Sequence, residues 1–250
     1  MKFNMDKQNL IERLRQQTAS LDAAGLLGVV AAEFGERIAF ATSFGAEDQV
    51  ITHLLCQLEK PGQIFSLDTG RLPQETYNTM ERTRKHYQIN IEAIVPDTHQ
   101  LEKLLGEHGP NLFYESVELR KQCCHVRKVE PLRRKLAGLD AWICGLRREQ
   151  AVTRADLERI EWDSFNGLIK INPLADWTHD QLWQFIRGNH IPYNVLHDRG
   201  YPSIGCAPCT RDIKDGEDIR AGRWWWEHPA TKECGLHPQA KSTSKSEEKQ

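Results

Sequence analysis

Hydrophobic and polar positions follow two periods in turn along most of the chain. Short apolar runs such as RIAFATSFG (37–45) and QIFSLDTG (63–70) are typical of buried strands that lead into loops. The segment between them, EDQVITHLLCQLEK (47–60), repeats its apolar residues at helical spacing, with Val50, Leu54 and Leu58 on one face. Strands that alternate with helices predict a mostly parallel sheet covered on both faces.

The same order continues on both sides of these elements. We expect two helices over residues 1–34, further helices over 73–87 and 98–109, and strands over 89–96, 141–149 and 167–174. A polar, arginine-rich loop separates the last two strands. We therefore expect one domain over 1–240, with a helical N-terminal part over 1–35. The tail over 241–250 contains no apolar residue able to anchor it and is expected to be disordered.

The composition narrows the classes of protein. At 250 residues the chain can bury a sizeable core, and its net charge of −2 argues against a general nucleic-acid binder. No apolar run approaches the roughly 18 residues of a membrane span, and the first residues lack the apolar stretch of a signal peptide. We expect a cytoplasmic protein with neither a nucleic-acid nor a membrane partner.

Three polar loops follow predicted strands, over 42–48, 68–71 and 145–154. In open sheets of this kind, ligands bind beyond the C-terminal ends of the strands. Two of the loops contain glycines, which allow a ligand to approach the backbone closely. Any one of them could be an ordinary turn, but the three together favour a nucleotide pocket.

The common phosphate-binding signatures, G-x-x-x-x-G-K-[ST] and G-x-G-x-x-G, are absent from the sequence. SFGAED (43–48) lies between a strand and a helix, where backbone N–H groups can hold an anion. It resembles the S-G-G-x-D-S loop of ATP pyrophosphatases, with Phe44, Glu47 and Asp48 as departures. Two carboxylates at the helix start disfavour a triphosphate and favour a smaller anion, a phosphate or a sulfate. The expected positive lining comes from Arg147, Arg148 and Arg154.

Seven cysteines, an odd number, fit metal or thiol chemistry better than a disulfide framework. Four of them form two pairs, Cys123–Cys124 and the C-x-x-C of Cys206 and Cys209. Adjacent cysteines fit poorly around one tetrahedral zinc, whereas the four irons of a cubane cluster can each take one ligand. The pattern favours a [4Fe-4S] cluster over structural zinc, with metal-free redox thiols as a third reading.

The remaining cysteines divide by their surroundings. Cys56 and Cys144 sit in apolar helix and strand patterns and are expected in the core. Cys234, in TKECGLHP, lies between charged and turn-forming residues close to the end of the chain. It is either an accidental surface thiol or a nucleophile carried on a C-terminal segment.

Five stretches of the chain resemble the sulfonucleotide reductase family: SFGAEDQV, LDTGRLPQETY, KQCCHVRKVEPL, GCAPCTRDIKDGEDIRAGRWWWE and KECGLH. The resemblance spans about Ala41 to His237. It implies a Rossmann-like fold of the adenine nucleotide alpha hydrolase type. In this family, four cysteines in the pattern seen here hold one [4Fe-4S] cluster per subunit and mark members that act on adenosine 5′-phosphosulfate (APS).

The resemblance also implies a mechanism and partners. Cys234, on a mobile segment over about 228–240, attacks the substrate sulfur to form an S-sulfocysteine and release AMP. Thioredoxin (or glutaredoxin) then frees sulfite, as part of assimilatory sulfate reduction. The subunits are expected to form a homo-oligomer.

Family roles transfer residue by residue. Lys128 is expected between cluster and substrate, and His237 at the substrate's anionic end. The expected nucleotide contacts are Ser43, Phe44, Gly45, Asp68, Thr69 and Gly70. The expected phosphate and sulfate contacts are Arg154, Arg220 and Arg223.

Three alternatives remain open on the sequence. The substrate could be the 3′-phosphorylated nucleotide (PAPS), or the enzyme could accept both forms. The chain could be a PP-loop ATP pyrophosphatase that thiolates tRNA, which would release pyrophosphate. It could also be a zinc or iron–sulfur module that binds nucleic acid, although the charge balance offers no basic surface for that role.

Overall fold

The computed structural model describes residues 5–151, 154–228, 232, 235 and 236. The helices are α1 (Met5–Thr18), α2 (Ala23–Phe34), α3 (Ala46–Leu55), α4 (Gln74–Tyr87), α5 (Thr98–His108), α6 (Val117–Cys124), α7 (Glu130–Leu136) and α8 (His179–Gly188). The strands are β1 (Ile38–Ala41), β2 (Gln63–Leu67), β3 (Glu92–Ile94), β4 (Ala141–Ile143), β5 (Ile160–Asp163) and β6 (Leu168–Ile171). Both predicted N-terminal helices and every predicted strand are present.

The strands form one sheet in the order β3-β2-β1-β4-β6-β5. All neighbouring pairs are parallel except β5–β6, which is antiparallel. The chain first builds the sheet from β1 outward to β3, and then returns to the other side of β1 with β4. This change of direction creates a switch point between β1 and β4, the position at which open α/β sheets bind ligands.

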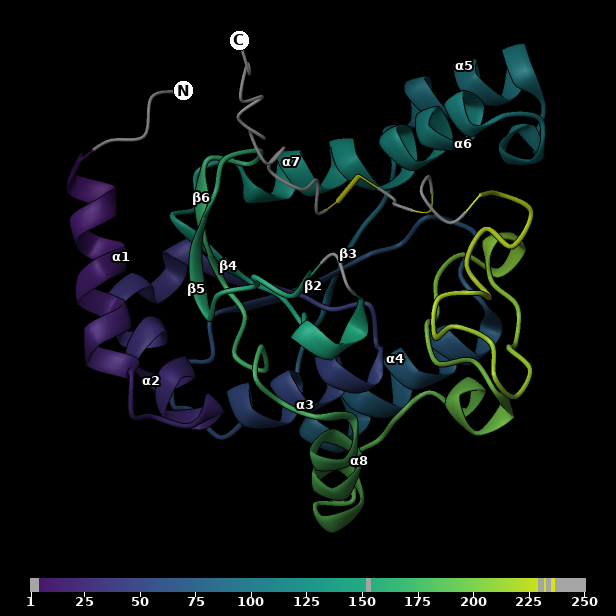
Figure 1. Ribbon diagram of the computed structural model, residues 1–250. Coiled ribbons are helices and arrows are strands. Elements are labelled where there is room, and N and C mark those ends of the chain that lie inside the picture. The colour runs from purple at the N-terminus through teal and green to yellow at the C-terminus, as the bar shows by residue number, and fades with distance from the viewer. Residues whose placement is uncertain (1–4, 152–153, 229–231, 233–234, 237–250) are drawn as a thin grey trace, which may run out of the picture.

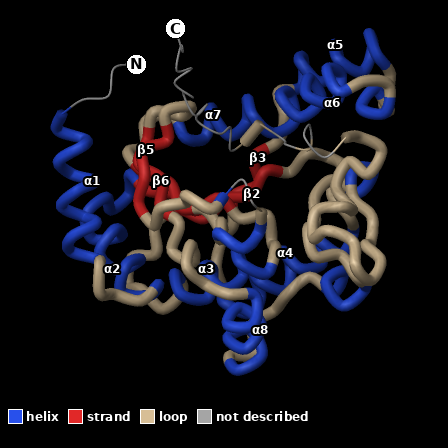
Figure 2. Tube along the Cα trace, in the orientation of Figure 1, coloured by secondary structure: helices blue, strands red, loops and turns tan. Residues whose placement is uncertain are grey.

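Helices cover both faces of the sheet (Figures 1 and 2). Alternate residues of β1 and β4 point to opposite faces. Phe40 and Ile143 join the core packed against α1, α2, α3 and α8. Ala39 and Trp142 join a second core packed against α7. The predicted fold class, a mostly parallel sheet flanked by helices, is confirmed.

Strand β5 and helices α6, α7 and α8 are absent from the sequence prediction. The segment predicted as loop contains β5, whose order Ile160-Glu161-Trp162-Asp163 is the alternation of a half-buried edge strand. Helix α8 was also missed, although Thr178 and Gln181 form a capping box at its start and Leu182 and Ile186 repeat at helical spacing. In both cases polar neighbours concealed a short amphipathic pattern.

Helix α1 covers the β5 edge of the sheet, and the guanidinium of Arg15 donates a 2.9 Å hydrogen bond from Nε to the carbonyl of Ile160. Beyond α8 the described chain forms no further α-helix, and it packs its loops beside the C-terminal ends of the strands (Figure 1). Within the described ranges, none of the helices combines the length and the apolar character needed to cross a membrane.

Candidate active site

A cleft of about 720 Å³ opens at the C-terminal ends of β1, β2 and β4. All three predicted loops contribute to it, with Ser43, Thr69 and Gly145 among its lining residues. Its outer wall comes from α8 and from the loops over 197–220. The cleft therefore lies at the switch point of the sheet and is large enough for a nucleotide.

The β1–α3 loop is held by one carboxylate. Asp48 accepts hydrogen bonds from the Ser43 backbone N–H at 2.6 Å and from the Ser43 hydroxyl at 2.7 Å. Phe44 has a left-handed backbone with φ 61°, and its ring is buried in the core under the cleft. Ser43 and Asp48 of this loop thus bond to each other, and Gly45 lines the cleft.

We expect Asp48 to make stability depend on pH. Burial raises the pKa of Asp48 from 3.8 to about 6, although the hydrogen bonds from Ser43 oppose it. Because the folded state holds this proton more tightly than the unfolded chain, the associated stability is complete below pH 3.8 and is lost as pH rises through 6. At about 1.4 kcal/mol per pKa unit, the change is on the order of 3 kcal/mol.

Asp48→Asn should therefore remove that decline and raise the free energy of unfolding at pH 7, because the amide keeps an acceptor oxygen for Ser43 and buries no charge. Urea unfolding between pH 4 and pH 7 measures it. Asp180→Asn, at an exposed position in the first turn of α8, should keep the wild-type profile. A decline of wild-type size in Asp48→Asn would contradict the prediction.

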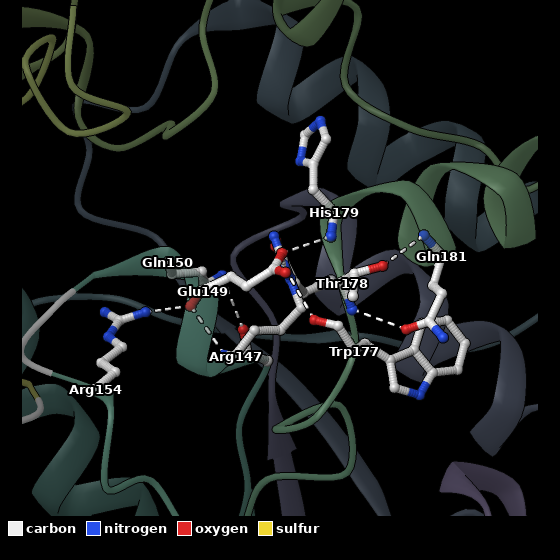
Figure 3. Close-up of polar contacts among 10 residues, drawn as sticks. Arg147, Glu149, Gln150, Arg154, Trp177, Thr178, His179 and Gln181 are labelled. Carbon is white, nitrogen blue, oxygen red and sulfur yellow. Dashed lines mark hydrogen bonds and ion pairs between the residues drawn. The ribbon is translucent and has the colours of Figure 1, made fainter.

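Glu47 and the predicted arginine lining form an internal network. Arg147 is buried and donates from Nε to Glu47 at 2.9 Å. It also donates from Nη1 to Glu149 at 3.2 Å, and these two side chains are labelled in Figure 3. Arg148 is ion-paired with Asp176. Arg147 lines the cleft as expected and compensates Glu47, whereas Arg148 is not among the described residues that line it. Arg154 lines the cleft and donates to Gln150.

This network also weakens the repulsion that was expected between the β1–α3 loop and a large anion such as a triphosphate. Glu47 is neutralised by Arg147, so it repels an anion less than its sequence position suggests. Asp48, with a pKa raised to about 6, still carries most of its charge at pH 7.

Other predicted cations do reach the cleft. Lys128, Arg220 and Arg223 line it together with Arg154. The side chain of Arg220 donates to the backbone carbonyl of Lys232 at 3.2 Å, and Leu236 lies in the cleft wall. The described residues on both sides of Cys234 are thus held at the cationic part of the cleft.

The outer wall contains residues that sequence reasoning missed. His179, Trp183 and Arg187 are spaced four residues apart on α8 and line the cleft together with His197. The spacing of these three side chains is the signal that could have found them, since it places them on one helical face.

The four paired cysteines lie together as predicted. Cys123 and Cys124 end α6, Cys206 and Cys209 flank a short 3₁₀ turn, and all four are buried around one small cavity. Among the described residues, no group of three or more His, Cys, Asp or Glu side chains is arranged to hold a single metal ion. Cys144 is buried in the core as expected, whereas Cys56 is only partly buried at the end of α3.

Cationic side chains surround these thiols. Arg71, Arg120, Arg127, Lys128 and Arg223 line the cysteine cavity. Burial by itself raises the pKa of Cys206, but Lys128, a hydrogen bond with the Thr69 hydroxyl, Arg223 and Arg127 outweigh it and the pKa is lowered. Burial raises the pKa of Cys209 to about 12, and the thiols of Cys206 and Cys124 add to that rise.

Lys128 lies between the cleft and the cysteine cavity. It belongs to the π-helical turn His125–Val129 that joins α6 to α7, and it lines both the cleft and the cysteine cavity. Arg223 and Trp224 also line both. The two cavities therefore share one cationic wall.

Some predicted residues lie elsewhere. Asp68, Gly70 and Phe44 are placed beside or beneath the cleft rather than among the described residues that line it. Asp68 accepts hydrogen bonds from the Gly70 backbone N–H and the Tyr77 hydroxyl, both at 2.8 Å, which occupies one of its oxygens. Cys234, His237 and most of the predicted 228–240 segment lie outside the described residues.

A sheet of this order with a cationic cleft at its switch point defines a nucleotide-binding protein of the Rossmann-like adenine nucleotide alpha hydrolase type. The phosphoadenosine phosphosulfate reductase domain matches residues 37–212. The chain therefore belongs to the phosphoadenosine phosphosulfate reductase family.

Named relatives agree with this assignment. An adenosine 5′-phosphosulfate reductase of Allochromatium vinosum is 54% identical over 220 residues, which cover 88% of this chain and 86% of the relative. A protein of the same name from Burkholderia cepacia is 53% identical over 214 residues, 84% of this chain and 86% of the relative. These names support an enzyme of this kind.

Solved structures support the fold. The phosphoadenylyl-sulfate reductase of Candida auris has a TM-score of 0.70 and 28% identity, and the match covers 84% of this chain and 99% of that one. An FMN adenylyltransferase of Candida glabrata shares the fold alone, with a TM-score of 0.53 and 16% identity over 96% of this chain and 83% of that one.

Proposed function

We propose that this protein reduces adenosine 5′-phosphosulfate to sulfite and AMP, with Cys234 as nucleophile and a dithiol protein of the thioredoxin class as reductant. The observation that carries the proposal is the path of the chain around Cys234. Lys232 and Leu236 flank this cysteine, and both contact the wall of the cationic cleft. Relatives at about half identity are named for the same substrate.

The chemistry divides into two displacements. The Cys234 thiolate attacks the sulfur of the sulfuryl group, the bond from sulfur to the phosphate oxygen breaks, and AMP leaves. A reductant thiolate then attacks the Cys234 sulfur, and sulfite leaves with the electron pair of the sulfur–sulfur bond. The second reductant thiol resolves the mixed disulfide and restores Cys234.

Residues of the cleft support the first displacement. A thiolate and a sulfonate repel each other, so cations must screen both charges. Lys128, Arg154, Arg220 and Arg223 lie on the cleft surface for that purpose. Arginine suits the two groups because its planar fork can bond two oxygens of a phosphate or sulfate.

We also propose that the four paired cysteines hold a [4Fe-4S] cluster, one per subunit. The donor set fits, since four buried thiols face one cavity lined by five cationic side chains and Thr69 lies 3.3 Å from the Cys206 sulfur. Bound there, the cluster would supply a compact negative centre beside Lys128. Anaerobically purified protein should be brown and contain about four irons and four sulfides per chain; a colourless, zinc-loaded protein would contradict this part of the proposal.

Sulfite formation tests the function directly. The purified protein should release sulfite and AMP from adenosine 5′-phosphosulfate when thioredoxin is present. Incubation with the nucleotide alone should leave one SO₃ group on Cys234, detectable by mass spectrometry of the peptide. Pyrophosphate release from ATP without any sulfite would instead support the adenylation alternative.

The 3′-phosphorylated nucleotide is the second candidate substrate. The solved neighbour from Candida auris, named a phosphoadenylyl-sulfate reductase, favours it. The ratio of kcat/KM for the two nucleotides decides between them, and we expect the unphosphorylated form to be preferred. A homo-oligomer stays a prediction, to be measured by light scattering.

Gly205 should be essential for placing Arg223. A Cβ at this glycine would collide with the Arg223 guanidinium, so Gly205→Ala must move that side chain. A misplacement of about 1 Å can cost on the order of 100-fold in rate, and we expect a loss of that size in kcat/KM.

The matched control is Gly106→Ala in α5, where a Cβ would meet nothing within 4 Å. It should keep kcat/KM and gain about 0.5–1 kcal/mol in the free energy of unfolding, because Ala is the better helix former. Wild-type kcat/KM in Gly205→Ala would show that Arg223 is not needed where the structure puts it.

A further inference from the structure

A buried ion pair joins helix α6 to the chain just before the Cys234 segment. Arg120 donates from Nε to one oxygen of Glu227 at 2.8 Å and from Nη2 to the other at 2.7 Å. The two side chains are 0% and 3% exposed and come from residues 107 positions apart. This bidentate geometry fixes the direction of the carboxylate as well as its distance.

Arg120 also contacts the cysteine centre. It hydrogen-bonds the side chain of Cys124, and its guanidinium lies 4.7 Å from the centroid of the Trp224 ring. Arg223 lies over the same ring at 4.6 Å. One buried cation therefore connects a thiol of the first cysteine pair to the segment that leads to Cys234.

The second cysteine pair holds the same segment through its backbone. The Trp224 N–H donates to the carbonyl of Cys209 at 3.2 Å, and Thr210 forms an isolated bridge with Arg223. Trp224 has φ 41°, a left-handed conformation that a bulky side chain adopts only where its surroundings enforce it. Residues 223–227 are thus attached to both cysteine pairs.

The chain goes from this attachment to the cleft. Past Glu227, the next described residues are His228 and then Lys232, whose carbonyl accepts from Arg220 at the cleft. Cys234 is only seven positions after Glu227. Fully extended, seven residues span at most about 25 Å, so Cys234 cannot lie farther than that from Glu227.

We propose that the Arg120–Glu227 pair is a positioning anchor that sets the root of the Cys234 segment against the four-cysteine centre. Only the expected effect of the anchor on turnover rests on the proposed function. A buried ion pair by itself contributes little to stability, and apolar residues of similar size often replace one without loss. Its bidentate geometry gives it a directional role. Glu227 and Arg120 act through Cys234 and touch no reacting atom.

The first test uses trypsin on the purified protein without substrate. Trypsin cleaves after lysine, and Lys232 is five positions after Glu227. Glu227→Gln keeps the side-chain size but loses the charge, and we expect cleavage after Lys232 to become roughly tenfold faster with unchanged iron content. Glu33→Gln is the matched control, since Arg13–Glu33 is likewise an Arg–Glu pair at 2.7 Å but is exposed; its cleavage rate should equal that of wild type.

The second test measures turnover of the same variants. Glu227→Gln should lower kcat on the order of 100-fold, the effect expected for a misplaced nucleophile, with little change in KM, since the cleft residues are untouched. Glu227→Asp, which keeps the charge, should recover part of kcat. Glu33→Gln should match wild type in both constants.

The outcomes separate the proposals. A wild-type cleavage rate together with a wild-type kcat in Glu227→Gln would overturn the anchor. A loss of iron in this variant would also overturn it, because it would show that the pair stabilises the four-cysteine centre instead. The double variant Arg120→Met/Glu227→Met removes both buried charges together. We expect trypsin to cleave it after Lys232 faster than wild type. A wild-type cleavage rate in the double variant would overturn the anchor, because it would show that each residue only compensates the charge of the other. If wild type itself forms no sulfite, the proposed function fails, while the trypsin result still decides on the anchor.

Discussion

Cys234→Ser should abolish sulfite formation while the protein keeps its fold and its iron. A serine hydroxyl is almost wholly protonated at neutral pH and cannot replace a thiolate in attack on sulfur. Removing the nucleophile of an enzyme costs about 10⁴- to 10⁶-fold in kcat, which places the residual rate below detection. Binding of AMP should be unchanged, because the proposed nucleotide contacts are cleft residues other than Cys234.

Two measurements accompany this variant. Peptide mass spectrometry after incubation with adenosine 5′-phosphosulfate should find the SO₃ group on Cys234 in wild type and on no cysteine in the variant. Cys56→Ser is the control, since Cys56 caps the C-terminal end of α3 and lines neither cavity. Normal turnover by Cys234→Ser would remove the nucleophile from the proposal.

Cys209→Ser should lose the iron centre and most of the activity. Changes in residues that merely support a metal ligand cost about 10- to 100-fold in metal affinity, so the loss of a ligand itself should exceed roughly 100-fold. The cationic side chains around the cavity would then lose the negative charge of the centre, and Arg120 would keep its Glu227 partner. We expect a colourless protein with a lowered melting temperature.

Iron and sulfide analysis, the visible spectrum and thermal unfolding measure these effects together. Cys144→Ser is the more demanding control for this variant, because Cys144 is equally buried but lies in the core of the sheet. It should lose stability and keep its iron. Full iron content in Cys209→Ser would mean that another group completes the centre and that the assignment of ligands is wrong.

The sequence predicted the sheet and the cysteine grouping because both leave short-range signals. Apolar runs at strand length gave β1, β2, β4 and β6, and the doubled cysteines pointed to one centre before the structure brought their segments together. Strand β5 was missed because two of its four residues are acidic, which is typical of an edge strand with one wet face.

The net charge of the cleft could not be predicted from short-range sequence patterns. Arg147 and Glu47 both belong to loops that the sequence placed at the pocket, but their pairing across 100 positions cancels both charges. Arg120 and Glu227 gave no signal as a pair, since they lie 107 positions apart in the sequence. Long-range ion pairs need the fold to be recognised.

The packing of α1 on β5 has a consequence for synthesis. Arg15 bonds to Ile160, 145 positions later. At about 5–20 residues per second, the first helix leaves the ribosome roughly 7–30 s before the strand it covers. During that interval Ile11 and Leu14, which are buried in the finished protein, have no sheet to pack against. The N-terminal helix is therefore the part of the nascent chain that we expect a chaperone to shield.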